Sequence, residues 1–411
     1  MEAVVVDVVK VVGEWRVSPP LGSVPPTELR LSYFDVSMVS VQVEYLFFFD
    51  FPGSTQDFRD VHFPRLRNSL SLALSLFYPL GGQAVPSQES PYPGDHVIRY
   101  SDGDSVSLTL AESGADFASL VGNQAKEATA FHPLVPPLSH VITSVNSTEA
   151  TKRQGTQLIA FRVTVFPGAG FSVGLTYNHV VPDGFGIVHF LKSWAAISKA
   201  GGEDVSVVKH PPVSDRAVLG DLEPLKRAFL VESAAKSRDS HASSDETLYF
   251  WLPANHRHRH RPPVRSPYFG NISPVSAVVE VSTSELTREN GAGHAARAIQ
   301  AAIRRIDEGR VEQLPAVGRR WTEVMGSKPR ERRFSVAGSP LFRVYDLDFG
   351  WGRLRKVEFP SMEETELASL SDSREEEGGV EVGVGGPEEE VIRFTSLFEE
   401  GLKSLCNVSK L

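Results

Sequence analysis

The sequence predicts a mixed α/β (α+β) protein with two domains. A chain of 411 residues is longer than a single hydrophobic core usually serves, so two domains of roughly 200 residues are expected. Strand-like apolar runs alternate with amphipathic helical patterns in both halves, and a polar stretch rich in Ser, Lys, Asp, Gly and Pro lies between them. We therefore expect an N-terminal domain at 1–198, a linker and surface loop at 199–245, and a C-terminal domain at 246–411.

The first half contains the clearest periodic patterns. Leu66, Leu70 and Leu74 recur at helical spacing and predict an amphipathic helix. This helix is expected over 58–77, and a second one is expected over 184–198. The expected strands are 5–12, 41–49, the two arms of a hairpin over 97–110 with Asp102-Gly103 as its turn, 156–165 and 171–177.

The second half resumes the alternation of strands and helices after the polar stretch. The expected strands are 247–253, 275–281, 342–347 and 380–384, and the expected helices are 292–307 and a terminal helix that starts at Pro387. Glu388, Glu389 and Glu390 occupy the first turn of the terminal helix, where acidic side chains interact favourably with the positive end of the helix dipole.

Composition excludes several classes of partner. The formal net charge of −9 gives no general attraction to nucleic acid or to an anionic membrane, so neither partner is expected. The single cysteine, Cys406, excludes an intramolecular disulfide framework and suits a reducing compartment. The N-terminus lacks the positive start and unbroken apolar stretch of a secretory signal. We expect a cytoplasmic globular protein.

Two histidines are followed by an aspartate four positions later, and their contexts differ. With 12 histidines and 51 acidic residues in the chain, chance alone predicts about 1.5 such matches. His241 and Asp245 lie in the polar stretch with no strand before them, so this match is given almost no weight. His179 and Asp183 instead follow an apolar strand and precede an amphipathic helix. Reactive side chains are common at such strand-to-helix turns.

The segment at His179 has two interpretations. An imidazole with a pKa of about 6.5 is suited to take a proton from an alcohol at neutral pH. Because Pro182 and Gly184 force irregular backbone, Asp183 is free to turn inward and brace the loop through a cationic partner. Alternatively, His179 is a structural residue at a strand end and Asp183 caps the following helix. The local sequence supports both interpretations equally.

Two further motifs accompany this segment. Asp348-Phe-Gly-Trp-Gly352 follows a predicted strand, and Tyr268-Phe-Gly-Asn271 follows a Pro-rich turn. Shorter elements are Phe77-Tyr-Pro-Leu-Gly-Gly82, Ala130-Phe-His-Pro-Leu134 and Asp215-Arg216. In this order and at this separation, the motifs resemble those of the plant BAHD acyltransferases, a family marked by H-x-x-x-D-G and D-F-G-W-G. The resemblance covers nearly the whole chain.

The resemblance implies both a fold and residue roles. The fold is two chloramphenicol-acetyltransferase-like domains with mixed sheets, and the acyl-CoA and the acceptor enter a channel between them from opposite faces. His179 matches the family's catalytic base. Asp183, followed by Gly184, matches a structural aspartate that pairs with an arginine of the second domain, for which Arg257 is the best match. The D-F-G-W-G positions are implied to be structural, namely Asp348, Gly350, Trp351 and Gly352.

The Y-F-G-N element narrows the resemblance. Its residues are Tyr268, Phe269, Gly270 and Asn271. It resembles the signature of a branch that acylates anthocyanin and other phenolic glucosides, often from malonyl-CoA, in which a cysteine follows. Ile272 stands in that place here, and Leu354 replaces a usual proline after D-F-G-W-G. The implied reaction transfers an acyl group, with malonyl first and hydroxycinnamoyl or acetyl as alternatives, to a hydroxyl of a phenolic or flavonoid glucoside.

The implied chemistry needs no permanently bound cofactor and no metal, because acyl-CoA is a co-substrate. His179 takes the proton of the attacking hydroxyl and then protonates the departing CoA sulfur, without a covalent acyl-enzyme. The oxyanion formed between these steps needs preorganised donors. By position, Gly338 and Ser339 with nearby backbone N–H groups are candidates.

Other functions fit less well. Asp348-Phe-Gly350 is also a kinase tripeptide, but the chain has no catalytic-loop H-R-D and no Walker lysine, so phosphoryl transfer is excluded. In an extended segment His256, His258 and His260 share one face, and the arginines beside them disfavour a metal ion. This cluster and a second basic group are candidates to bind CoA phosphates or a malonyl carboxylate. For most of these residues a solvated charged face is favoured. The second group is Arg319, Arg320, Lys328, Arg330, Arg332 and Arg333.

The second half is shorter than the family pattern between Phe229 and Thr247, by a few tens of residues. The part that is missing normally supplies apolar helices, and the polar stretch 231–246 cannot replace them. Its absence predicts a gap lined with apolar surface in the second core, and lower stability. The rival hypothesis is therefore a catalytically inactive or misannotated shortened relative that acts at most as a binding protein.

Overall fold

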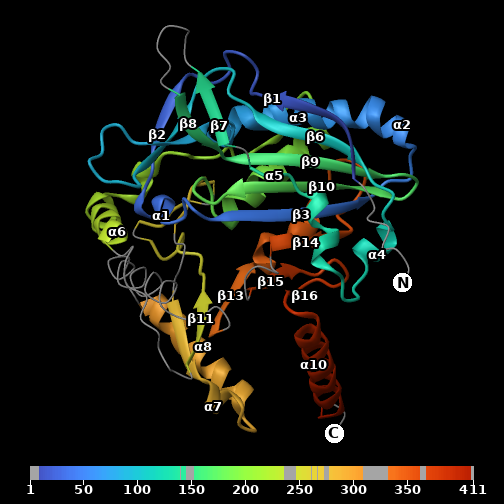
Figure 1. Cartoon of the computed structure of the whole chain (residues 1–411), viewed down its shortest axis with the longest axis vertical. Helices are drawn as coiled ribbons and strands as arrows, with labels where there is room; N and C mark the ends of the chain where they lie inside the picture. Colours follow the sequence, from blue (N-terminus) through green and yellow to red (C-terminus); the bar gives the residue numbers. More distant parts are fainter. Residues whose placement is uncertain are drawn as a thin grey trace.

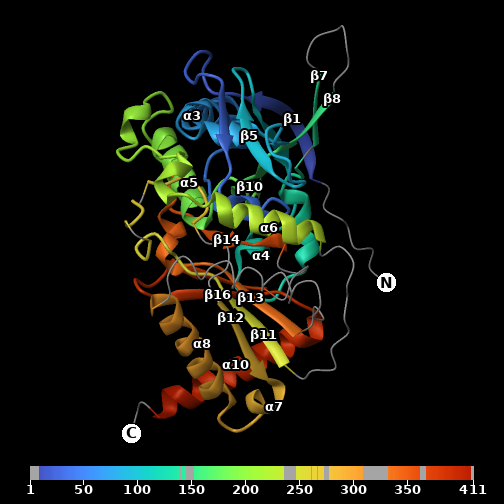
Figure 2. The same cartoon turned by 90° about the vertical axis from the view of Figure 1, so that its left-hand side faces the viewer.

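The computed structural model of the protein has a mixed α/β fold, as the sequence predicts (Figures 1 and 2). The residues that it describes are 9–138, 140–144, 152–235, 247–260, 262–265, 267–272, 277–308, 332–361 and 367–408. Their strands form one six-stranded and two five-stranded sheets. The sheets built mainly from the first half lie at one end of the molecule, and the sheet of the second half lies at the other. No helix in these ranges has both the length and the apolar character needed to cross a membrane.

The six-stranded sheet forms the centre of the first half. Its order is β1 (Lys10–Val17), β6 (Val106–Glu112), β9 (Ile159–Phe166), β10 (Gly170–Asn178), β3 (Gln42–Asp50) and β14 (Lys356–Glu358). Alternate side chains of β3 enter different clusters, Phe47 and Phe49 on one face and Leu46 and Phe48 on the other. This sheet is therefore covered on both faces, which explains why β10 is buried along its whole length and β9 at every position except Arg162.

Two helices pack together against this sheet, α3 (Phe63–Leu76) and α5 (Gly184–Lys199). The leucines at 66, 70 and 74 are fully buried, so the predicted helical stripe is confirmed. A π-helical turn at Phe58–His62, preceded by the short helix α2 (Thr55–Asp57), leads into α3. The indole N–H of Trp194 in α5 donates to the carbonyl of Leu66 (3.1 Å) and thereby links the two helices.

A five-stranded sheet lies beside the six-stranded sheet, and its strand order differs from two sequence predictions. Its order is β2 (Thr27–Arg30), β5 (His96–Tyr100), β4 (Gln83–Pro86), β8 (Lys152–Gln157) and β7 (His140–Ser144). The turn at Asp102-Gly103 exists, but the predicted hairpin is wrong, because β5 pairs with β2 and β4 whereas β6 lies between β1 and β9. The single strand predicted over 156–165 is likewise divided at Leu158 into β8 and β9, which belong to different sheets.

The third sheet belongs to the second half. Its order is β12 (Ala277–Ser282), β11 (Thr247–Leu252), β13 (Arg333–Gly338), β15 (Leu367–Asp372) and β16 (Val380–Val384). The accompanying helices are α7 (Thr283–Leu286), α8 (Gly291–Glu308) and α10 (Glu388–Val408). The strand predicted over 342–347 is wrong, since this region consists of two 3-10 turns, Pro340–Phe342 and Val344–Asp346. Arg343 between them has φ of 51°, which is incompatible with extended backbone.

The segment predicted as a surface linker is partly folded into the first half. It contains 3-10 turns at Val205–Val207 and Arg216–Leu219 and the helix α6 (Glu223–Ala235). Arg216, Leu219 and Leu230 are buried, so the surface-loop prediction is wrong for these positions and for α6, whereas most residues of 201–222 are exposed as expected. Residues 236–246, with His241 and Asp245, lie outside the described residues. The domain limits at 198 and 246 remain a prediction.

The remaining short helices lie in the first half. They are α1 (Tyr33–Val36), α4 (Phe117–Val121) and the 3-10 turns Tyr78–Gly81, Ala128–Ala130 and His132–Leu134. In the second half, β16 and α10 expose an unusual amount of apolar surface. Leu397 and Phe398 are 60% and 51% exposed, and Val380, Val382 and Val384 of the edge strand are also exposed. The apolar gap expected for a shortened second core stays a prediction.

Candidate functional site

The segment after β10 places His179 at the entrance to α5. Its backbone N–H donates to the carbonyl of Val41 (2.9 Å), which extends the pairing of β10 with β3 by one residue. The buried Asn178 secures the turn, because its side chain accepts from the N–H of Val180 (2.9 Å) and donates to the carbonyl of Val39 (2.9 Å). His179 is therefore the point where regular strand ends and the chain turns toward the helix.

Asp183 has both of the roles that the sequence left open. Its backbone is extended and its Oδ1 accepts from the N–H of Gly186 (3.0 Å), so it caps α5. Its two oxygens also accept from Arg257, with Nη1 2.7 Å from Oδ2 and Nη2 2.9 Å from Oδ1. The predicted partnership of Asp183 and Arg257 is thus present as a bidentate ion pair. It joins the helix of the first half to the segment that follows β11.

Arg257 is held in place from several sides. Its backbone N–H donates to the side chain of Asn255 (2.9 Å), and its Nη2 donates to the carbonyl of Tyr268 (3.2 Å). The guanidinium also lies over the ring of Phe185, 5.1 Å from the ring centroid. Because the two paired side chains are only 7% and 14% exposed, water screens the interaction of Arg257 with Asp183 weakly.

The imidazole of His179 is half-buried at the end of β10. The ring stacks on Tyr177 at a centroid distance of 6.0 Å. Its Nδ1 is buried without a hydrogen-bond partner among the described residues. Burial lowers the pKa of His179 below its ordinary value, and the nearby Asp183 carboxylate offsets this only partly. The ring is therefore neutral at pH 7 and able to accept a proton.

The Y-F-G-N element packs directly beneath this turn. Tyr268, Phe269 and Asn271 are all buried, and the ring of Phe269 meets that of Phe77 at 5.0 Å. A Cβ on Gly270 would lie 2.9 Å from the Cζ of Arg216, so only glycine allows this approach. The element is thus a core component beside the site. Burial strongly raises the pKa of Tyr268, so its phenol stays protonated.

The D-F-G-W-G segment lies against α3 and α5. Asp348 accepts from the backbone N–H groups of Gly350 (2.8 Å) and Gly352 (3.2 Å) and from Lys199 Nζ (2.7 Å). Burial acts to raise the pKa of Asp348, but these donors outweigh it and the pKa lies below its usual range. The indole N–H of Trp351 donates to His62 Nδ1 (2.7 Å). The described contacts of the D-F-G-W-G segment hold it in place, and none of them reaches His179.

Gly338 is the last residue of β13, and Ser339 caps the 3-10 turn Pro340–Phe342, which packs against the beginning of α5. The hydroxyl of Ser339 accepts from the N–H of Leu341 (3.2 Å), so this side chain caps a local turn. Three residues later, the ring of Phe342 packs on Phe185 (4.8 Å) and its carbonyl accepts from Lys192 Nζ (2.9 Å). A Cβ on Gly184 would meet the Phe342 ring at 2.5 Å, so glycine is required for this packing. The oxyanion role of Gly338 and Ser339 remains a prediction.

The histidine–arginine run does not form the predicted alternating faces. Residues 255–260 form a turn, in which the N–H groups of Arg259 and His260 both donate to the carbonyl of His256. Burial and the neighbouring Arg259 lower the pKa of His256 to about 4. Within the described ranges, no cluster of His, Cys, Asp and Glu suits a metal ion. Arg319, Arg320, Lys328 and Arg330 lie outside the described residues.

Nearly the whole chain is similar to known proteins. The model of the Transferase family matches residues 9–228 and 226–401. Malonyl-coenzyme:anthocyanin 5-O-glucoside-6'''-O-malonyltransferase of Salvia splendens is 30% identical over 93% of this chain and 94% of its own length. The chain belongs to the BAHD acyltransferase family. This BAHD protein is accordingly an acyl-CoA-dependent O-acyltransferase, which transfers an acyl group from coenzyme A to a hydroxyl.

Other relatives of this BAHD protein are similar over comparable lengths. Malonyl-coenzyme A:anthocyanin 3-O-glucoside-6''-O-malonyltransferase of Dahlia pinnata is 28% identical over 95% of this chain and 96% of its own. Phenolic glucoside malonyltransferase 1 of Arabidopsis thaliana is 28% identical over 96% and 98%. The alignment with the Salvia splendens protein spans 446 residues, more than the 411 of this chain, so the relative contains residues that this chain lacks.

Solved structures show the same fold. Vinorine synthase matches with a TM-score of 0.65 at 17% identity and covers 94% of this chain and 96% of its own. F. sporotrichioides TRI101, solved with coenzyme A and T-2, matches with a TM-score of 0.59 at 11% identity and covers 90% and 97%. The two-domain fold expected from the sequence is confirmed by these matches.

Sequence reasoning missed one buried residue beside the site. Asp35 in α1 has no exposed surface and lies at the centre of a polar network described below. A signal was present, because Ser32 and Asp35 form a capping box that is visible as a spacing in the sequence. Nothing local indicated that the same carboxylate faces two other segments of the chain.

Proposed function

We propose that this BAHD protein transfers a malonyl group from malonyl-CoA to a sugar hydroxyl of a phenolic or flavonoid glucoside, with His179 as the general base. The observation that carries the proposal is the imidazole itself, which is neutral, held at the end of β10, and has a buried Nδ1 without a partner among the described residues. The choice of donor and acceptor is supported by the malonyltransferases of Salvia splendens, Dahlia pinnata and Arabidopsis thaliana.

The proton balance of the reaction needs only His179. The imidazole takes the proton of the acceptor hydroxyl as its oxygen attacks the thioester carbonyl, and a tetrahedral oxyanion forms. When the carbon–sulfur bond breaks, the imidazolium returns the proton to the departing CoA sulfur. Burial disfavours the imidazolium, which assists this second transfer. The backbone N–H groups at Gly338 and Ser339 are the proposed donors to the oxyanion.

Asp183 acts in this proposal as a brace and not as the orienting acid of a catalytic triad. Both of its oxygens are already occupied, Oδ1 by the N–H of Gly186 and by Arg257 Nη2, and Oδ2 by Arg257 Nη1. The ion pair links the beginning of α5, where the turn after β10 ends, to the second half. The D-F-G-W-G segment stabilises α3 and α5 in the same indirect way.

A second candidate function rests on the exposed apolar surface of α10 and β16. Together with the longer alignment to the Salvia splendens protein, this surface supports a shortened relative that binds acyl-CoA or glucosides without turning them over. For the active enzyme, hydroxycinnamoyl-CoA and acetyl-CoA are the alternative donors, because Ile272 stands where the malonyl-CoA branch has cysteine. We propose a cytoplasmic monomer in either case.

The test is transfer of label from radioactive malonyl-CoA to a phenolic glucoside by the purified full chain, with acetyl-CoA and p-coumaroyl-CoA as competing donors. We expect malonyl transfer by the wild type and none by His179→Ala. His96→Ala, which changes a histidine on the second sheet, is the matched control and keeps its activity. Equal turnover by the wild type and His179→Ala overturns the mechanism. Binding of malonyl-CoA without turnover by the wild type supports the second candidate.

A further inference from the structure

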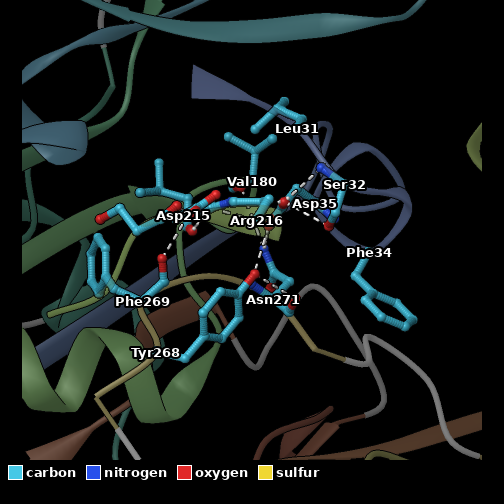
Figure 3. A network of polar contacts seen from close by, with 12 residues as sticks. Leu31, Ser32, Phe34, Asp35, Val180, Asp215, Arg216, Tyr268, Phe269 and Asn271 are labelled. Carbon is cyan, nitrogen blue, oxygen red and sulfur yellow. Dashed lines mark hydrogen bonds and ion pairs between the residues drawn. The ribbon is translucent and has the colours of Figure 1, made fainter. Parts of the chain in front are cut away.

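A buried polar network that does not include the Asp183–Arg257 pair also contacts the turn after β10 (Figure 3). Its centre is the carboxylate of Asp35 in α1, which has no exposed surface. The Oδ2 atom accepts from the backbone N–H and hydroxyl of Ser32 (2.9 and 2.7 Å) and from Arg216 Nε (3.1 Å). The Oδ1 atom accepts from the backbone N–H and side-chain amide of Asn271 (3.1 and 3.0 Å).

Two members of this network also contact the backbone that carries the imidazole. The side-chain amide of Asn271 donates to the carbonyl of His179 (2.8 Å) and lies 3.4 Å from the carbonyl of Val180. The Nη2 atom of Arg216 donates to the carbonyl of Val181 (3.0 Å). Three successive carbonyls after β10 thus accept hydrogen bonds from two side chains that come from distant segments.

The backbone needs such donors at this turn. Val180 and Val181 are fully buried, and the irregular conformation before Pro182 gives their carbonyls no partner in a sheet or helix. If a peptide plane here rotates, the Cα–Cβ direction of His179 rotates with it, and the imidazole moves. A displacement of about 1 Å at a reacting group is sufficient to reduce a rate by about 100-fold.

The side chain at position 271 has to be a hydrogen-bond donor. The amide nitrogen of Asn271 faces a carboxylate and two carbonyls, all of which only accept hydrogen bonds. Its Oδ1 is buried without a partner among the described residues, so this end of the amide contributes nothing to the contact. A carboxylate in the same place would set oxygen against oxygen and a second negative charge beside Asp35.

We propose that Asn271 is a positioning residue for His179, and that Asp35 and Arg216 hold its amide in the orientation that secures the turn. The inference rests on the proposed role of His179 as the base. It assigns to the last residue of the Y-F-G-N element an effect on the rate of proton transfer, separate from the recognition of either substrate.

The experiment measures kcat and KM for malonyl-CoA and the glucoside in Asn271→Ala and Asn271→Asp, each below its own melting temperature. We expect kcat to fall by about 100-fold in Asn271→Ala and further in Asn271→Asp, while both KM values stay within about threefold of the wild type. The matched control is Lys126→Met, which breaks another largely buried ion pair, with Glu358 (2.6 Å), but has no described contact to the turn or to the Asp35 network. This control is expected to lower the melting temperature and leave kcat unchanged.

The outcomes separate the two proposals. Wild-type kcat in folded Asn271→Ala, while His179→Ala is inactive, overturns the positioning role and leaves the proposed function intact. Activity in His179→Ala overturns the proposed function instead. If Asn271→Ala does not fold, Arg216→Lys decides the matter, because lysine keeps a cation beside Asp35 but lacks the branch that reaches Val181. The same selective loss of kcat is then expected, and an unchanged kcat overturns the inference.

Discussion

Replacing Arg257 by methionine tests whether the ion pair with Asp183 braces the site. The methionine keeps most of the side-chain volume beside Phe185, but removes the cation over that ring and both hydrogen bonds to the carboxylate. Asp183 then stays largely buried, because its side chain is only 14% exposed in the intact pair. Removing one partner of such a pair costs about 3–5 kcal/mol of unfolding free energy.

A comparison at Asp183 separates the ion pair from the helix cap. In the variant Asp183→Asn, the new side chain still accepts from the N–H of Gly186, since asparagine is a good cap, but it lacks the charge that pairs with Arg257. Asp183→Ala loses both interactions. We expect Asp183→Ala to be less stable than Asp183→Asn by about 1 kcal/mol, which is the usual cost of losing a cap.

Urea unfolding followed by the fluorescence of Trp194 and the other tryptophans measures these differences. The malonyl transfer assay at low urea measures kcat in the same variants. We expect kcat to fall in all three variants, because the turn that carries His179 then loses its link to Arg257 and keeps its contacts with Asn271 and Arg216. A loss of less than about 1 kcal/mol in Arg257→Met would refute the reasoning, since it would show that the pair is effectively solvated.

Three further predictions concern other parts of the molecule. The plot of kcat/KM against pH should have its acid limb below pH 6.5, because the base must be neutral and burial lowers the pKa of His179; a limb above 6.5 contradicts this assignment. Trp351→Phe removes the hydrogen bond to His62 and should lower the unfolding free energy by about 1 kcal/mol with kcat unchanged, as urea titration and the transfer assay would show. Leu397→Lys with Phe398→Lys should change stability by no more than about 0.5 kcal/mol and reduce self-association in light scattering, and a larger loss of stability would show that this face is covered.

Local signals in the sequence were sufficient for the immediate surroundings of His179. The apolar run of β10 and the periodic run of α5 predicted their elements correctly, and the residues between them had to be irregular because of Pro182 and Gly184. Neighbours in sequence decide such a turn, so the cap by Asp183 was also visible. The pairing of Asp183 with Arg257 came from the family resemblance, and the structure contains it.

Local signals in the sequence did not predict which strands pair with each other. The turn at Asp102-Gly103 was predicted correctly, but β5 and β6 belong to different sheets, because each strand pairs with edges that segments far along the chain supply. The region 342–347 has strand-like composition, yet the left-handed Arg343 turns it into two 3-10 helices that pack Phe342 against α5. In both regions packing against distant elements overrides the local preference.

The sequence by itself determined that this chain is a BAHD acyltransferase and that His179 stands in its H-x-x-x-D-G motif. Only the tertiary structure decided what surrounds that turn. Asp35, Arg216 and Asn271 are separated by long stretches of chain, and nothing in their own segments shows that they meet. They meet because burial removes water from the carbonyls after β10, and those carbonyls must then find donors wherever the fold supplies them.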